Sequence, residues 1–137
     1  QEAANDILAG HDRIHLIEPL DVFDFHNLAS RSYFIMTDSG GVQEEAPSLG
    51  KPVLVLRDTT ERPEGVRAGT LKLVGTNPAC VKEAMAVLLT DETLYRKMSQ
   101  APNPYGDGRA SERIVRAIQH YFGMAESVSE FKEGEEA

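Results

Sequence analysis

The residue types in the segment TDSGGVQEE, positions 37–45, are suited to binding a phosphate group. Gly40 and Gly41 have no side chain, so backbone N–H groups at this point can come close to an anion. If a helix begins here, its first N–H groups are unpaired and carry a partial positive charge. Ser39 adds a hydroxyl donor. The segment therefore favours a phosphate or a diphosphate.

Glu45 lies about one helical turn beyond the glycines. A carboxylate near a bound diphosphate accepts hydrogen bonds from a sugar diol but repels the phosphates themselves. Its position therefore suits a ribose. A structural interpretation of the same residues is also open, because glycine pairs after strands often form only a turn, and the helix dipole favours acidic residues in the first turn.

A second polar loop, RDTTERPEG, follows the next apolar run and carries two arginines, Arg57 and Arg62. Arginine can hold a phosphate through two parallel hydrogen bonds. The alternative is a solvated loop in which the arginines pair with Asp58, Glu61 and Glu64, since surface ion pairs are common and individually weak. The charge pattern alone leaves both interpretations open.

Four short apolar runs could place both loops at one edge of a sheet. They are residues 14–17, 33–36, 53–56 and 71–74. Segments long enough for a helix separate them, and the runs are apolar at nearly every position, which is typical of parallel strands covered on both faces. The sequence therefore predicts an α/β fold, a Rossmann-like parallel sheet with flanking helices, and ligands at the carboxyl ends of its strands.

Capping residues mark several of the predicted helices. Asp21 precedes the segment VFDFHNLASR, and Asn77 with Pro78 opens PACVKEAMAVLLT, so both segments have a favourable start. Two further helices are expected over residues 91–99 and 109–122.

Composition excludes some classes of partner. The chain has 137 residues, the size of one domain, and a formal net charge of −8. Such a charge argues against binding a nucleic acid or an anionic membrane, because both would be repelled. A single cysteine cannot form an internal disulfide, and no apolar run approaches the ~20 residues of a membrane span. These features predict a soluble, cytoplasmic protein.

The two ends of the chain differ from the middle. Residues 1–10 begin within a helix-favouring pattern without an N-cap, which indicates that a helix starts upstream and that the chain is a fragment. Residues 123–137 hold little to bury and end in several glutamates: Glu126, Glu130, Glu133, Glu135 and Glu136. We therefore predict one partial domain over residues 1–122 and a flexible acidic tail over residues 123–137.

The histidines and the cysteine do not form a recognisable chemical site. His11 and His15 are four residues apart, but Gly10 and the predicted strand take them off a common helix, so no metal site is expected. His26 and His120 are interpreted as surface or packing residues on helices. Cys80 has no base or partner thiol in view and is assigned a structural role.

The motifs TDSGGVQEEAPSLGKPVLVLRDTTERPEG, AGTLKLVGT and NPYGDGRASERI resemble the C-terminal domain of non-hydrolysing bacterial UDP-N-acetylglucosamine 2-epimerases. The resemblance covers residues 12–121. It implies a GT-B-type fold, in which two Rossmann-like domains hold a UDP-sugar in the cleft between them.

The resemblance also implies roles for individual residues. Ser39, Gly40 and Gly41 would hold the diphosphate, Glu45 the ribose and Arg62 a phosphate. The uracil would lie against the segment PLDVFDF, with contacts from the backbone of Leu20 and the ring of Phe25.

The family's reaction, as the resemblance implies it, inverts C2 of the sugar by eliminating UDP and adding it back, and so interconverts UDP-GlcNAc and UDP-ManNAc. It uses no external cofactor, occurs in cell-envelope polysaccharide biosynthesis, and belongs to enzymes that form homodimers. The N-terminal domain with the acid–base groups is missing here, so no catalytic residue is assigned and the chain alone is expected to be inactive. Two alternatives are a UDP-sugar-binding portion of a GT-B glycosyltransferase and a stand-alone UDP-binding module.

Overall fold

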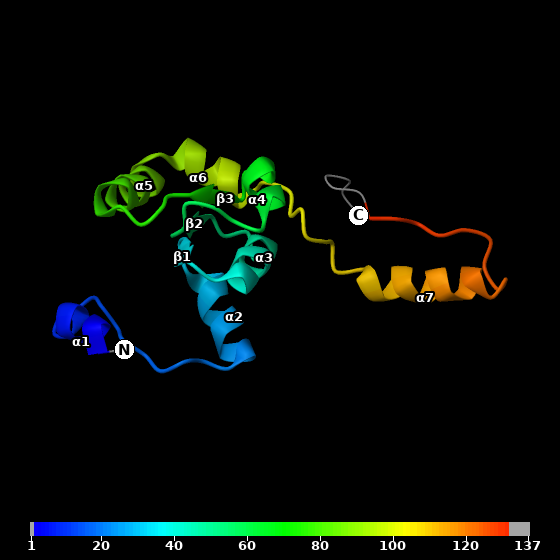
Figure 1. Cartoon of the computed structure of the whole chain (residues 1–137), viewed down its shortest axis with the longest axis horizontal. Helices are drawn as coiled ribbons and strands as arrows, with labels where there is room; N and C mark the ends of the chain where they lie inside the picture. The colour runs from blue at the N-terminus through cyan, green and yellow to red at the C-terminus, as the bar shows by residue number, and fades with distance from the viewer. Residues whose placement is uncertain (1, 132–137) are drawn as a thin grey trace.

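The computed structural model describes residues 2–131, and a small parallel sheet lies at its centre (Figure 1). The strands are β1 (Ile35–Thr37), β2 (Val53–Val55) and β3 (Leu71–Leu73), in the order β1-β2-β3. Both pairings are parallel, with Val53 opposite Ile35 on one side and opposite Leu71 on the other. Three of the four predicted strands are thus confirmed, as is their parallel arrangement.

The prediction of a fourth strand at residues 14–17 is wrong. This segment is irregular, and its backbone pairs with no strand among residues 2–131. Ile14, Leu16 and Ile17 are 40%, 43% and 59% exposed. An apolar run becomes a strand only where a neighbouring strand takes up its backbone hydrogen bonds, and here no strand lies beside it.

Seven helices are present in the described part of the chain: α1 (Glu2–Leu8), α2 (Val22–Arg31), α3 (Gly40–Ser48), α4 (Pro63–Ala68), α5 (Pro78–Thr90), α6 (Glu92–Ser99) and α7 (Ala110–Tyr121). Asp21 Oδ1 caps α2 through two backbone N–H groups, each at 2.9 Å, and Asn77 Oδ1 caps α5 at 2.9 Å. The predicted caps are therefore confirmed.

Each face of the sheet carries its own core. On one face Ala46 of α3 packs with Val53, Val55 and Leu71. On the other face Leu54 packs with residues of α5 and α6: Ala84, Leu88 and Met98. Alternate residues of β2 point to opposite faces, so both helical layers are anchored on this one strand, whose three residues are all fully buried.

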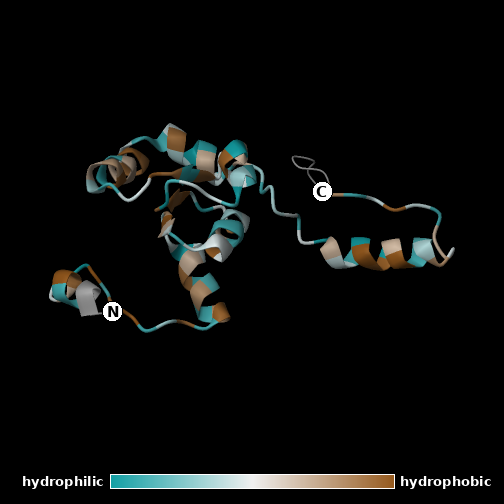
Figure 2. Ribbon diagram, in the orientation of Figure 1, coloured by the Kyte–Doolittle hydropathy of each residue, from teal (hydrophilic) through white to brown (hydrophobic). Residues whose placement is uncertain are grey.

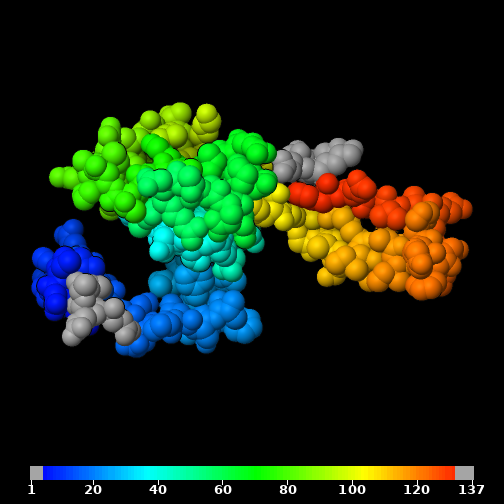
Figure 3. All heavy atoms as spheres, viewed as in Figure 1, coloured from blue at the N-terminus to red at the C-terminus, as the bar shows by residue number. Residues whose placement is uncertain are grey.

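The helix α7 lies away from this core, at the end of an extended connection (Figure 1). None of its residues is buried, although it carries an apolar stripe that Figure 2 shows along its length. Residues 123–131 contain no helix or strand and run back beside α7 (Figure 3). The domain boundary at residue 122 and the flexibility of the tail stay predictions, and Glu133, Glu135 and Glu136 lie outside the described residues.

Two kinds of structure do not occur among residues 2–131. No helix there is long and apolar enough to cross a membrane. No group of three or more histidine, cysteine, aspartate or glutamate side chains is placed there to hold a metal ion.

Candidate functional site

The turn between β1 and α3 forms the first part of the candidate site. β1 ends at Thr37, whose hydroxyl accepts a hydrogen bond of 3.0 Å from the N–H of Ser39. α3 begins directly afterwards at Gly40. Ser39 is the N-cap residue, but its side chain caps no N–H of the helix. The first N–H groups of α3 and the Ser39 hydroxyl therefore lie together at the carboxyl edge of the sheet, where parallel sheets bind ligands.

The two glycines have different surroundings. A Cβ atom added to Gly40 would lie 2.5 Å from Glu61 Oε1, so a side chain here would collide with that carboxylate. A Cβ atom added to Gly41 would lie 3.8 Å from the nearest atom, Glu45 Oε1, which is ordinary van der Waals contact. Because Glu61 Oε1 is the end of a flexible side chain that can move aside, this contact does not by itself require glycine at position 40, and the contact at Gly41 does not require it either.

Glu61 thus places a carboxylate beside the start of α3. A hydrogen bond from its own backbone N–H is the main cause that lowers the pKa of Glu61, and the positive charges of Arg57 and Arg62 lower it further, while burial acts in the opposite direction. Arg57 Nη1 donates to Glu61 Oε2 over 2.8 Å. An anionic oxygen is therefore held next to a helix N-terminus, as the helix dipole favours.

Arg62 connects the second loop with α3. Its Nε atom donates to the carboxylate of Glu44, and Nη1 donates to the carbonyl of Glu61 over 3.3 Å. Its Nη2 atom lies 4.0 Å from the position that a Cβ atom on Gly40 would take. The structure therefore brings the Arg62 guanidinium and the start of α3 together. The two arginines of this loop form ion pairs, Arg57 with Glu61 and Arg62 with Glu44. The first of these is a pair that the solvated-loop interpretation predicted.

Glu45 contacts a residue that the sequence analysis had set aside. His26 Nε2 on α2 lies 3.0 Å from Glu45 Oε2, and both side chains are nearly half exposed. The neighbouring Phe25 ring lies 5.8 Å from the His26 ring, centroid to centroid. Leu20 precedes the α2 cap and is 39% exposed. A contact between residues 19 positions apart leaves no local pattern in the sequence, so His26 could not have been assigned to this site in advance.

A buried glutamine joins the two loops. Gln43 is completely buried; its Nε2 donates to the carbonyl of Ser39 over 3.1 Å. Its Oε1 accepts a hydrogen bond of 2.6 Å from the hydroxyl of Thr60. The same hydroxyl accepts a hydrogen bond of 3.0 Å from the N–H of Arg62. The local sequence does not distinguish Gln43 from the other polar residues around it, since its hydrogen-bond partners lie four and 17 positions away.

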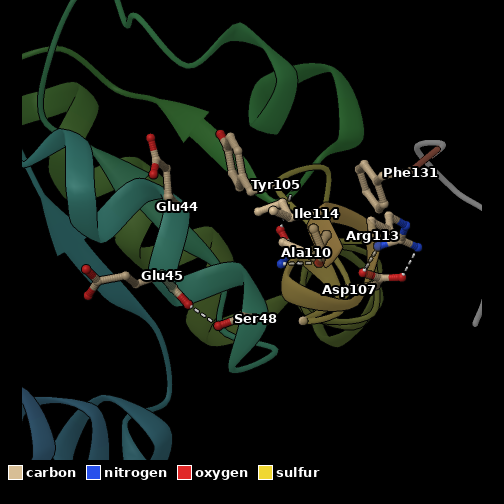
Figure 4. A pocket seen from close by; sticks show the side chains of 12 residues that line it. Glu44, Glu45, Ser48, Tyr105, Asp107, Ala110, Arg113, Ile114 and Phe131 are labelled. Carbon is tan, nitrogen blue, oxygen red and sulfur yellow. Dashed lines mark hydrogen bonds and ion pairs between the residues drawn. The ribbon is translucent and has the colours of Figure 1, made fainter. Parts of the chain in front are cut away.

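An open groove of about 600 Å³ begins beside Glu45 and extends to the start of α7 (Figure 4). Glu44, Glu45 and Ser48 of α3 line one side of it. The other side comes from the connection before α7, with Tyr105 and Asp107, from α7 itself, with Arg113, and from Phe131 in the segment after α7. The groove therefore joins the proposed ribose side of the site to the α7 region.

Two contacts organise the far side of this groove. The Tyr105 hydroxyl accepts a hydrogen bond of 3.1 Å from the N–H of Gly65, and burial is the main cause that raises the pKa of Tyr105. Arg113 donates to both carboxylate oxygens of Asp107, over 2.6 and 2.7 Å. These hydrogen bonds hold the pKa of Asp107 well below its usual range. The guanidinium carbon of Arg113 also lies over the Phe131 ring, 5.7 Å from the centroid of that ring.

For the remaining histidines and the cysteine, the absence of a metal site at His11 and His15 and the structural role of Cys80 stay predictions. His11 and His15 are exposed, and neither belongs to a metal-binding group among residues 2–131. His120 Nδ1 lies 2.9 Å from the carbonyl of Ala125 at the end of α7, a local structural contact. Cys80 is an exposed free thiol near the start of α5.

Comparison with known proteins identifies relatives of this chain. The family profile described as UDP-N-acetylglucosamine 2-epimerase matches residues 1–119. The UDP-N-acetylglucosamine 2-epimerase of Bacillus subtilis is 65% identical over 123 residues, which are 90% of this chain and 32% of that protein. The chain therefore spans about a third of the length of the curated relatives it matches.

Solved structures of proteins similar to this chain include complexes with UDP and with UDP-GlcNAc. A co-structure of S. aureus MnaA with UDP has a TM-score of 0.89 and 64% identity, over 96% of this chain and 36% of that one. A UDP-GlcNAc 2-epimerase from Neisseria meningitidis bound to UDP-GlcNAc has a TM-score of 0.81 and 50% identity, over 87% of this chain and 33% of that one. The predicted α/β class, a Rossmann-like parallel sheet with flanking helices, is confirmed.

Proposed function

Because this chain belongs to the UDP-N-acetylglucosamine 2-epimerase family, we propose that it is the UDP-binding part of an enzyme that interconverts UDP-GlcNAc and UDP-ManNAc. The observation that carries the proposal is the meeting of a glycine-lined helix start with an arginine at one edge of a parallel sheet. This part holds the leaving group, while the acid–base groups for C2 belong to the two thirds of the relatives' length that this chain does not span.

The diphosphate binds at the start of α3. Ser39, Gly40 and Gly41 offer it a hydroxyl and unpaired backbone N–H groups, and a helix N-terminus favours an anion. The Glu61 carboxylate already lies against Gly40, which supports the view that this place accepts anionic oxygens. A bound diphosphate has to move that carboxylate aside.

Arg62 supplies positive charge from the neighbouring loop. Its guanidinium carries five N–H donors, of which Nε and Nη1 are used for Glu44 and for the Glu61 carbonyl. Nη2 faces the start of α3 and can donate to a phosphate there. Elimination of UDP builds negative charge on the leaving diphosphate, so donors that are already aimed at it lower the barrier.

The nucleoside lies on the α2 side of this site. Glu45 accepts hydrogen bonds from the ribose hydroxyls, and its contact with His26 keeps the carboxylate turned towards α2. The Phe25 ring and the backbone of Leu20 receive the uracil. These two residues come from α2 and from the segment before it, so the base and the diphosphate are held by different elements.

The domain organisation, the location and the oligomeric state of the complete enzyme can be proposed from the same family. We propose that residues 1–122 belong to the C-terminal domain of a GT-B-type fold, that residues 123–137 form its tail, and that the complete enzyme is a cytoplasmic homodimer in cell-envelope polysaccharide biosynthesis. The reaction needs no external cofactor, since elimination and re-addition of UDP involve no net oxidation.

Calorimetric titration of the chain with UDP, ADP and inorganic diphosphate tests the proposal. UDP should bind more tightly than either of the others, because only UDP uses the base, ribose and diphosphate contacts together. Equal affinity for UDP and ADP would contradict the uracil assignment, and no heat of binding with any of the three would contradict the whole site.

A second measurement concerns the reaction itself. With UDP-GlcNAc in deuterated water, the chain alone should give no exchange of the C2 proton above background, because it supplies no base for that proton. Exchange by the chain alone would show that the acid–base chemistry resides within these residues. A protein extended to the full length of the relatives is the positive control.

A further inference from the structure

We propose that Gln43 and Thr60 are positioning residues that hold the Arg62 loop at a fixed distance from the start of α3, and so set the geometry of diphosphate binding. The inference rests on the proposed function, because it assigns a purpose to the link between the two loops that would hold UDP. It adds two residues that do not themselves contact the ligand.

The Gln43 side chain can have only one orientation. The carbonyl of Ser39 accepts but cannot donate, so the atom 3.1 Å from it must be the amide nitrogen. The carbonyl oxygen Oε1 is then directed at Thr60, and the Thr60 hydroxyl donates its single hydrogen to it over 2.6 Å. Because Gln43 is fully buried, loss of the Thr60 hydroxyl removes the hydrogen-bond partner of its carbonyl oxygen, and a buried acceptor without a partner is costly.

Thr60 also forms a hydrogen bond with the backbone of Arg62. With its hydrogen directed at Gln43, the Thr60 oxygen has its lone pairs free to accept the N–H of Arg62 over 3.0 Å. An unbroken series of hydrogen bonds therefore runs from the Ser39 carbonyl to the Arg62 backbone. It joins the N-cap residue of α3 to the N-cap residue of α4.

The link matters because both ends belong to the proposed diphosphate site. β1 and β2 fix the two loops only up to Thr37 and Val55, and Thr60 lies five positions beyond the end of β2. The Arg62 side chain caps no N–H of α4; its backbone N–H donates to Thr60, and its Nε atom donates to Glu44 of α3. Bidentate binding of a phosphate needs the guanidinium at a set distance from the other donors.

Two adjacent residues of α3 hold Arg62 in different ways. Gln43 fixes its backbone through Thr60, and Glu44 takes a hydrogen bond from its Nε atom. The backbone link can persist when a ligand draws the guanidinium away from Glu44. The structure therefore assigns preorganisation of the loop to Gln43 and Thr60, independently of the ion pair.

The test replaces Thr60 by valine, which keeps the shape of the side chain and removes the hydroxyl. We expect Thr60→Val to weaken both UDP and inorganic diphosphate by about two- to tenfold, the equivalent of one hydrogen bond. Thr60→Ser keeps the hydroxyl and should restore the wild-type affinities. Thr59→Val is the matched control, because Thr59 is exposed and adjacent, and it should leave both affinities unchanged.

A double-mutant cycle separates positioning from stability. If Thr60 acts through Arg62, then Thr60→Val should weaken diphosphate much less in an Arg62→Ala background than in the wild type. A purely structural role would lower the unfolding temperature but leave the two effects on affinity additive. Thr60→Ala serves the same cycle if the valine variant does not fold.

Unchanged diphosphate affinity in Thr60→Val, with clear weakening by Arg62→Ala, overturns the positioning role and leaves the proposed function standing. Additive effects in the cycle also overturn it. If the wild-type chain binds neither UDP nor diphosphate, the proposed function fails and this inference fails with it.

Discussion

The helices α3 and α7 show how differently two parts of one chain are held. α3 has a weak apolar stripe, yet Gln43, Ala46 and Pro47 are buried because the helix packs directly on β1 and β2. α7 has a much stronger apolar stripe and buries nothing within the described residues. A stripe shows that a helix is able to bury a face, whereas burial depends on what lies beside it.

The largest expected effect contrasts the sheet core with α7. Leu54→Ala removes a completely buried side chain of β2 that packs against α5 and α6, and should lower the free energy of unfolding by about 2–5 kcal/mol. Ile114→Ala on α7 removes a side chain that is 59% exposed, and should change it by no more than about 0.5 kcal/mol. Urea unfolding followed by circular dichroism measures both, and equal losses would contradict the comparison.

The next effect concerns ligand binding on the α3 side. Glu45→Ala should weaken UDP by about 1.5–3 kcal/mol, since charged hydrogen bonds to the ribose are lost, while diphosphate should bind no more weakly than before. Glu83→Ala, which removes an exposed carboxylate from α5, is the charge-matched control. If calorimetry shows the same ratio of UDP to diphosphate affinity in Glu45→Ala as in the wild type, Glu45 does not bind the ribose.

A smaller effect in the opposite direction is expected from the loop that faces α3. Glu61→Gln removes the negative charge that lies against Gly40, and should tighten binding of diphosphate by roughly two- to fivefold at low salt. Because the pKa of Glu61 is lowered, its carboxylate is charged at neutral pH, and the repulsion is present there. Weaker binding by this variant would mean that Glu61 supports the site, for example by holding Arg57.

The smallest effect belongs to the α7 side of the groove. Arg113 lowers the pKa of Asp107, so the folded state favours the charged carboxylate. The stability that this pair contributes is present above the unfolded-state pKa of about 4 and is lost as the pH falls through the lower folded-state pKa. The urea midpoint of the wild type should therefore exceed that of Asp107→Asn slightly at pH 7, and the difference should shrink in acid. A difference that grows in acid would contradict this sign.

The UDP affinity of Asp107→Asn tests whether the α7 side of the groove takes part in UDP binding. The residue lines the groove but lies beyond the proposed UDP contacts. The affinity should stay at the wild-type value. A marked loss would extend the binding site along the groove towards α7.

Local signals in the sequence predicted local structure well. Asp21 and Asn77 were identified as caps because capping needs only a suitable side chain next to its own helix. The runs that became β1, β2 and β3 were recognised because strands covered on both faces are apolar at successive positions. The run at residues 14–17 has the same composition but no neighbouring strand, and composition does not record neighbours.

The candidate site also contains both local features and contacts between residues far apart in the sequence. Ser39, Gly40 and Gly41 follow a strand and open a helix, a local pattern that sequence reasoning can detect. The contact of His26 with Glu45 and the link from Gln43 to Thr60 join residues 19 and 17 positions apart. Such contacts follow from how helices pack on the sheet, so they become visible only in the folded chain.

The central position of β2 also sets the time scale on which different parts of the molecule exchange their amide hydrogens. The N–H of Val53 is bonded to Thr70, and the N–H of Leu56 to Thr37, so this strand uses hydrogen bonds on both sides. We therefore expect its amides to exchange with solvent deuterium only when the whole sheet opens. Because α7 has no buried side chain, we expect its amides to exchange through local fraying, and the two regions to open as separate cooperative units.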